Sequence, residues 1–282
     1  MPSNKQRREA AQRRLQRQLE RRAELARRRR RNVLIGVTVA AVVLVVGTVL
    51  LITGIGGDDT DTAAAEPTPS SAAATSGAAA PTTNPDGTVS CTYAPDDSGN
   101  PNLTDVGTPP TPEATPTQGT STLLMSTDQG DLTLTLDRAG APCAAASFTY
   151  LTQQQFFDGS SCHRLVNGEA FGVLQCGDPT GSGSGGPTYT YAEEVTPETT
   201  YPRGTIAMAN SGTPGSTGSQ FFLVFTDSQL PPDYTVVGTV DEAGLAVLDQ
   251  VAAAGNDGSF EPSPGGGGPN LPVTIETMTV VA

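Results

Sequence analysis

Residues 121–137 read STLLMSTDQGDLTLTLD and contain the clearest structural pattern of the chain. Two runs rich in apolar residues, 123–127 and 132–136, flank a polar tetrapeptide, and the second run alternates apolar and polar residues. A period of two is typical of a strand with one buried face, and a short polar connection containing glycine is typical of a hairpin turn. The stretch therefore predicts a β-hairpin and places the start of the ordered region near residue 120.

The sequence beyond this hairpin predicts two helices and six more strands. Residues 142–155 begin with a proline suited to a first helical turn, and residues 241–254 carry leucine and valine at helical spacing. Runs of strand composition are found at 162–166, 171–176, 205–208, 221–225, 234–240 and 273–281. Eight strands and two helices with Gly- and Pro-rich turns predict a mainly β domain, an eight-stranded antiparallel barrel capped by two helices, because closure removes exposed strand edges.

The N-terminal part has a different composition. Thirteen of the 16 Lys and Arg residues precede Asn32, and residues 33–55 are an uncharged, Val- and Leu-rich run of 23 residues. Such a run is long enough to cross a hydrocarbon core of ~30 Å, and basic residues beside it orient that end toward the cytoplasm. We therefore interpret the basic head as a topology signal rather than a nucleic-acid-binding region. A cleaved signal peptide is the alternative because residues 63–65 are alanines, but the apolar run is longer than a usual signal core.

Residues 56–119 are dominated by Thr, Ala, Pro, Ser, Gly and Asp without periodicity, which predicts a disordered linker. The predicted organisation is a basic cytoplasmic segment (1–32), a transmembrane helix (33–55), this linker and a folded domain (120–282). Four cysteines lie after the apolar run, where an oxidising compartment permits disulfides. The sequence leaves three pairings open among Cys91, Cys143, Cys162 and Cys176. A bridge through Cys91 would attach part of the linker to the domain.

Four motifs of the predicted domain carry a specific resemblance. They are FFDGSSCHRL at 156–165, QCGDPTGSGSGG at 175–186, RGTIAMAN at 203–210 and GSQFF at 218–222. In this order they resemble the cyclophilin-type peptidyl-prolyl cis-trans isomerases, and the resemblance covers residues 120–282. It implies an enzyme that acts on Xaa–Pro bonds of polypeptides without a cofactor or a metal. The Gly-rich run lacks the lysine of a phosphate-binding loop, and a hydrolase would need a base where His163 is the only histidine.

The resemblance also implies roles for individual residues. Catalytic roles fall to Arg164, Gln175, Asn210 and Phe222, and substrate binding falls to Phe171, Val173, Ala209, Leu230 and Tyr234. The sequence departs from the family at three of these positions. Phe171 precedes Gln175 by four residues where the family usually has three, Leu230 replaces a common Trp, and Tyr234 replaces a common His. We expect a bulge between residues 168 and 173, with Gly172 in an unusual conformation, to absorb the extra residue.

Arg164 can also be interpreted from the sequence alone. It is one of three basic residues beyond Asn32, in a region rich in Asp and Glu, so it is either a structural ion-pair partner or part of a site. The surrounding motifs favour the site. The sequence thus predicts a monomeric, single-pass, membrane-anchored prolyl isomerase that assists the folding of extracytoplasmic proteins and binds no nucleic acid. The alternative is a proline-binding chaperone or adaptor with little turnover.

Overall fold

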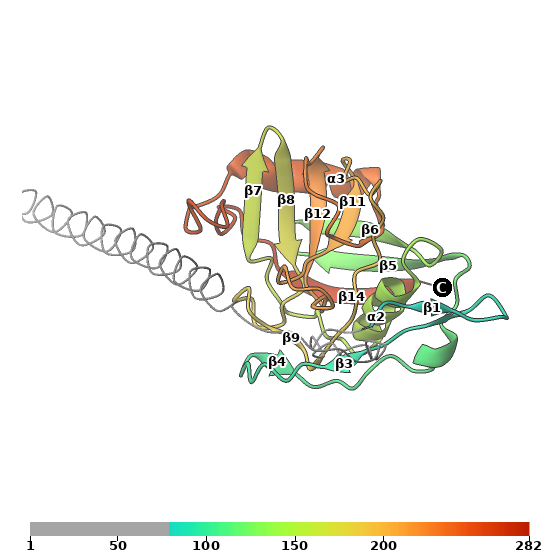
Figure 1. Ribbon diagram of the computed structural model, residues 1–282. Coiled ribbons are helices and arrows are strands. Elements are labelled where there is room, and N and C mark those ends of the chain that lie inside the picture. Colours follow the sequence, from blue (N-terminus) through green and yellow to red (C-terminus); the bar gives the residue numbers. More distant parts are fainter. Residues whose placement is uncertain (1–78, 282) are drawn as a thin grey trace, which may run out of the picture. The chain divides into compact units, whose positions relative to one another are not determined.

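The computed structural model describes residues 79–281 (Figure 1). The predicted basic segment, the predicted membrane helix at 33–55 and residues 56–78 of the predicted linker lie outside the described residues. Within 79–281, no helix is long and apolar enough to cross a membrane.

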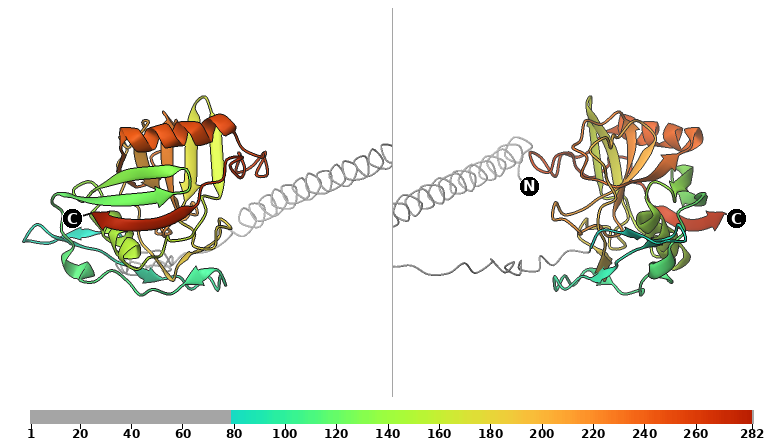
Figure 2. Two further views of the ribbon diagram at one scale, coloured as in Figure 1. Left: turned by 180° about the vertical axis from the view of Figure 1, so that it is seen from behind. Right: turned by 45° about the vertical axis from the view of Figure 1, so that its right-hand side comes forward.

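One antiparallel sheet of eight strands forms the centre of the domain, with the strand order β14-β5-β6-β13-β11-β12-β8-β7. Figures 1 and 2 show β5, β6 and β14 running across the direction of β7, β8 and β12, so the sheet curls strongly. Every predicted strand is present, with ends shifted by at most three residues. The strands are β5 (Thr120–Thr127), β6 (Gly130–Asp137), β7 (Arg164–Gly168), β8 (Phe171–Cys176), β11 (Thr205–Met208), β12 (Phe221–Thr226), β13 (Val236–Val240) and β14 (Ile275–Val281).

The mainly β class, the eight antiparallel strands and the two helices are confirmed, but the fully closed barrel is wrong. Among the described residues, β7 and β14 do not pair as a ladder. β7 instead makes an isolated bridge from Leu165 to Gly267, in the irregular loop that precedes β14. The backbone N–H and carbonyl of Leu165 are therefore paired with a loop, which covers this part of the edge without closing the sheet.

Two helices cover opposite ends of the curled sheet, α2 (Pro142–Gln153) and α3 (Glu242–Ala254) (Figure 1). Helix α3 begins where the side chain of Asp241 accepts a hydrogen bond from the Gly244 N–H, and it ends at Gly255, whose φ is 75°. Helix α2 has no such cap from its neighbouring residue Ala141. Its free N–H groups are instead bound by a residue far along the chain, Glu194.

The Glu194 carboxylate accepts the N–H groups of Cys143 (3.0 Å) and Ala144 (2.8 Å). Burial raises the pKa of Glu194 to about 6 from an ordinary value of 4.5, although both N–H groups favour the charged form.

A raised pKa of Glu194 in the folded state means that the protein becomes easier to unfold as the pH rises from about 4.5 to 6. We expect this group to lower the unfolding free energy by about 2 kcal/mol across that window. Urea unfolding of wild type and Glu194→Gln from pH 4 to 8 checks this. The unfolding free energy of the variant should no longer decrease between about pH 4.5 and 6 through this group. An equal decrease in both proteins would contradict the prediction.

Residues 79–119 correct the prediction of a disordered linker for that part of the chain. They contain the short elements β1 (Thr82–Thr83), β2 (Val89–Ser90), β3 (Ala94–Pro95), β4 (Leu103–Thr104) and the 3₁₀ turn η1 (Pro112–Ala114). β3 pairs with β10 (Tyr189–Thr190), and β4 pairs with β9 (Gly186–Pro187). The sequence shows no periodicity here because order comes from short pairings with the domain and not from a buried face of its own.

Two disulfides complete the fold, Cys91–Cys143 and Cys162–Cys176, so the structure selects one of the three possible pairings. The first attaches the N-terminal segment to helix α2. A bridge through Cys91 was expected to have this effect. Tyr93 reinforces this attachment, because its hydroxyl donates to the Cys143 carbonyl at 2.9 Å and its ring packs edge-on against Tyr189 and Tyr191.

Candidate active site

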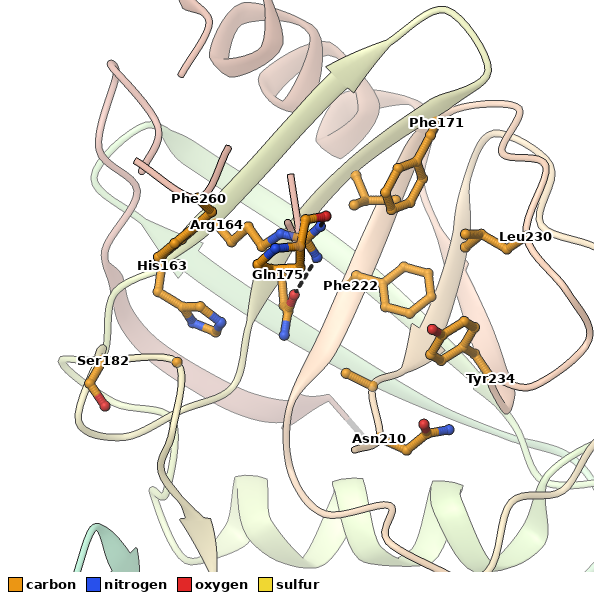
Figure 3. Close-up of a pocket in the computed structure, with 14 residues that line it drawn as sticks. His163, Arg164, Phe171, Gln175, Ser182, Asn210, Phe222, Leu230, Tyr234 and Phe260 are labelled. Carbon is orange, nitrogen blue, oxygen red and sulfur yellow. Dashed lines mark hydrogen bonds between the residues drawn. The ribbon is translucent and has the colours of Figure 1, made fainter. Parts of the chain in front are cut away.

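A groove with a volume of about 390 Å³ opens on the outer face of β8 and β12 (Figure 3). All nine residues that the sequence predicts for the site line this one groove: Arg164, Phe171, Val173, Gln175, Ala209, Asn210, Phe222, Leu230 and Tyr234. Figure 3 shows Arg164 beside Gln175 on one side, and Phe222, Tyr234 and Leu230 toward the other. Segments up to 70 residues apart in sequence thus meet at one surface.

The alternation of β8 explains how its side chains reach the groove. Phe171, Val173 and Gln175 line the groove, whereas Leu174 and Cys176 are buried in the core on the opposite face. The spacing of four residues between Phe171 and Gln175 therefore keeps both on the same face of a regular strand. A spacing of three would need an irregularity to do so.

The predicted bulge between residues 168 and 173 is wrong, because β7 and β8 pair in regular register from Arg164 opposite Gln175 to Gly168 opposite Phe171. The irregularity lies in the neighbouring strand β12, between Val224 and Thr226. Gly172 does not take a left-handed conformation. Its role is steric, since a Cβ atom there would lie 2.6 Å from the Cβ of Thr226.

Arg164 is held in a fixed position by three acceptors. Its Nη1 donates to Gln175 Oε1 (3.2 Å), its Nε to the Gly265 carbonyl (2.9 Å) and its Nη2 to the Pro264 carbonyl (2.8 Å). Burial lowers the pKa of Arg164, yet a guanidinium stays charged at any physiological pH. In the described part of the chain the only salt bridge joins Arg203 to Asp249, so no carboxylate forms an ion pair with Arg164 there. The Glu261 carboxylate is near enough to favour the charged guanidinium, but burial outweighs it.

A chain of hydrogen bonds supports this Arg–Gln pair. Gln175 Nε2 donates to Gln220 Oε1 (2.9 Å), and Gln220 Nε2 donates to the carbonyls of Gly183 (3.1 Å) and Gly185 (3.0 Å). The Gly-rich loop is fixed in turn by Asp178, which accepts the Gly183 N–H at 2.6 Å. Burial opposes ionisation of Asp178, but several N–H and O–H donors outweigh it and lower its pKa. The polar side of the groove is therefore preorganised.

The opposite side of the groove is apolar. Phe222 and Val173 are buried, and Phe171, Leu230 and Tyr234 pack around them. The rings of Phe222 and Tyr234 meet edge to face, 5.5 Å apart. Tyr201 holds Tyr234 in place, because its hydroxyl donates to the Tyr234 carbonyl and accepts the Tyr234 N–H, both at 2.9 Å.

Asn210 and His163 complete the rim. The Asn210 side chain donates to the Asp233 carbonyl (2.8 Å) and accepts the Gly212 N–H (2.9 Å), so it holds two loops together beside the groove. His163 lines the groove, and its Nδ1 has no hydrogen-bond partner among the described residues. Burial lowers its pKa, which favours a neutral imidazole at neutral pH.

Sequence reasoning missed the loop before β14. Phe260 and Pro264 line the groove, and the backbone of residues 264 and 265 holds Arg164. This loop has neither periodicity nor a motif, and a backbone carbonyl leaves no mark on residue type. Ser182 and Gly183 also line the groove; they belong to the motif at 175–186, but the resemblance implies no role for them.

An open groove with a fixed cation on one side and an apolar floor on the other suits an extended polypeptide containing an apolar residue. Comparison with known proteins points to a family of enzymes that act on polypeptides. Residues 122–280 match the family described as cyclophilin type peptidyl-prolyl cis-trans isomerase/CLD. The chain belongs to the cyclophilin-type peptidyl-prolyl cis-trans isomerase family.

Two curated relatives carry the name "Probable peptidyl-prolyl cis-trans isomerase B". The one from Mycobacterium leprae is 43% identical over 205 residues, which cover 67% of this chain and 66% of the relative. The one from Mycobacterium tuberculosis is 45% identical over 169 residues, which cover 56% of this chain and 52% of the relative. The chain thus spans between half and two thirds of their lengths. A solved cyclophilin type isomerase from Cryptosporidium parvum is 27% identical, with a TM-score of 0.49, and covers 58% of this chain and 99% of that one.

Proposed function

We propose that this protein is a peptidyl-prolyl cis-trans isomerase that acts on Xaa–Pro bonds of extracytoplasmic polypeptides and assists their folding. The observation that carries the proposal is the groove itself, where a guanidinium that forms no salt bridge with the described residues faces an apolar floor. Family membership supports the same activity. No covalent step and no cofactor enter the proposed reaction.

The mechanism follows from the chemistry of the amide. Resonance gives the Xaa–Pro bond a rotation barrier of ~18–20 kcal/mol. Twisting the bond returns electron density to the prolyl nitrogen, which becomes a better hydrogen-bond acceptor. A guanidinium that donates to this nitrogen binds the twisted state more tightly than either planar isomer, which is the requirement for catalysis. Because Arg164 is already fixed by Gln175 and two carbonyls, little of this energy is lost in ordering the side chain.

One charge-assisted hydrogen bond contributes ~1.5–3 kcal/mol, whereas a millionfold acceleration needs ~8 kcal/mol. Arg164 therefore accounts for only part of the effect. The apolar floor of Phe171, Val173 and Phe222 contributes further, because the planar amide is more polar than the twisted one and loses more on leaving water. The floor also orients the proline ring beside Arg164.

The alternative is a proline-binding chaperone or adaptor that keeps the groove but turns over slowly. The two functions separate in a protease-coupled assay, in which the full-length chain is mixed with an Xaa-Pro peptide whose trans isomer alone is cleaved. An isomerase accelerates the slow phase in proportion to its concentration. An adaptor binds the peptide and leaves the slow phase at its uncatalysed rate.

We also propose a single-pass membrane anchor at residues 33–55, with the catalytic domain outside the cytoplasm. The uncharged run, the basic residues before it and the two disulfides of the domain support this location. A reporter fused after Ala65 is expected to be active only outside the cytoplasm, and the mature protein should keep its N-terminus. Recovery of a soluble form that begins near Glu66 would replace the anchor with a cleaved signal peptide.

A further inference from the structure

A second pocket, of about 320 Å³, lies next to the groove and shares Gln175, Gly183, Ala209 and Asn210 with it. Because an extended chain advances about 3.3 Å per residue, a peptide with its proline over the apolar floor reaches this pocket within a few residues. The shared wall makes the two cavities one continuous site for a polypeptide.

The outer wall of this pocket comes from the N-terminal segment. Asp96, Asn100 and Leu103 line it beside the Gly-rich loop. Figure 1 shows β3, β4 and β9 together at this edge of the domain, in agreement with the pairing of β4 with β9. The wall is part of the folded domain, and its pairings with β9 and β10 order it.

Two asparagines hold the wall against the loop. Asn100 Nδ2 donates to the Ser184 carbonyl (2.7 Å), and Asn102 Nδ2 donates to Ser184 Oγ (2.8 Å). The backbone N–H of Asp96 donates to the Thr188 carbonyl (2.9 Å). These contacts continue into the hydrogen-bond chain through Gln220 and Gln175 that ends at Arg164, so the wall and the Arg–Gln pair share one support.

The lining of the second pocket has a definite chemical character. Asp96 is its only charged side chain; Oδ1 accepts the Ser98 N–H (2.9 Å), whereas Oδ2 accepts no hydrogen bond from the described residues. The hydroxyls of Ser184 and Ser211 add acceptors, and Leu103 and Pro187 offer apolar surface. A carboxylate that lines a partly apolar pocket matches the long stem and cationic head of lysine or arginine.

We propose that the second pocket is a specificity site in which Asp96 selects substrates with a lysine or arginine one to three residues from the proline. This proposal rests on the proposed function of the groove and extends it to a substrate class. Because Asp96 is partly exposed, the expected preference is moderate, roughly fivefold in kcat/KM for a lysine peptide over its glutamate counterpart.

The test uses the full-length chain and two series of short Xaa-Pro peptides, with Lys, Ala or Glu placed either before or after the proline. Turnover is read by the coupled assay and affinity by isothermal titration. In one of the two series we expect the order Lys, Ala, Glu, with the Lys-to-Glu ratio decreasing as salt is added. Asp96→Asn keeps the acceptor for the Ser98 N–H and should bring this ratio close to one.

Asp97→Asn is the matched control, because it removes the same charge from the neighbouring residue, which does not line the pocket. It should keep the wild-type ratio. No lysine preference in either series, or a preference that survives Asp96→Asn, would overturn the specificity site. If the peptides bind without turnover, the proposed isomerase activity is wrong. The ratio of the dissociation constants for the Lys and Glu peptides then tests the specificity site on its own. If no peptide binds at all, both proposals fail.

Discussion

Phe171→Ala is expected to lower kcat/KM for an Xaa-Pro peptide roughly 30- to 150-fold with little change in the thermal midpoint. The side chain is half-buried and lies on the groove face of β8, in a cluster with Val173 and Phe222 and away from the main core. Its removal therefore takes about 2–3 kcal/mol of apolar contact from the bound proline without leaving a cavity inside the fold.

Phe171→Leu is the matched control, because it keeps most of the apolar surface and should retain most of the activity. Steady-state kinetics and thermal unfolding of both variants show whether Phe171 contacts the bound proline or supports the core. If Phe171 supported the core instead, its loss would destabilise the fold by ~3–5 kcal/mol. A stable alanine variant with undiminished activity would leave the proline without the floor proposed here.

Arg164→Ala is expected to lower kcat/KM at least tenfold, again with a thermal midpoint close to that of wild type. The expected loss corresponds to one charge-assisted hydrogen bond of ~1.5–3 kcal/mol in the transition state. Stability should change little because no carboxylate among the described residues forms a salt bridge with this guanidinium, and water can reach the Pro264 carbonyl once it is vacated.

Arg138→Ala provides the comparison, because it removes the same charge from a residue that contacts Ser121, outside the groove. Its kcat/KM should match wild type. An Arg164→Ala protein that loses several kcal/mol of stability and keeps its kcat/KM would make Arg164 a structural residue.

The parts of the fold that follow local rules could be predicted from the sequence. Alternation in residues 132–136 indicates the hairpin, and Pro142 and Asp241 mark the two helix starts to within a residue. The nine site residues were found because four motifs resemble a known family, and the structure brings all nine to one groove. Their individual roles remain predictions, and the variants above test those of Phe171 and Arg164.

The parts that depend on distant contacts could not be predicted. The segment 79–119 has a composition typical of disorder, yet it is ordered by the bridge to Cys143, by Tyr93 and by short pairings with residues 186–190. The Pro264 and Gly265 carbonyls hold Arg164 through backbone atoms, which any residue carries. The bulge lies in β12, at the point where Thr226 comes too close to Gly172 for a Cβ atom there, and a pairwise steric fit of this kind has no sequence pattern.

Exchange spectroscopy by NMR on a Xaa-Pro peptide at equilibrium tests most directly whether the groove around Arg164 catalyses isomerisation. The uncatalysed bond interconverts in tens to hundreds of seconds, too slowly to give cross-peaks between the cis and trans signals. Catalytic amounts of the full-length chain are expected to produce these cross-peaks. The exchange rate obtained from them should be at least tenfold lower for Arg164→Ala. Peptide signals that shift on binding while cis and trans remain without exchange would contradict the account and identify a proline-binding adaptor.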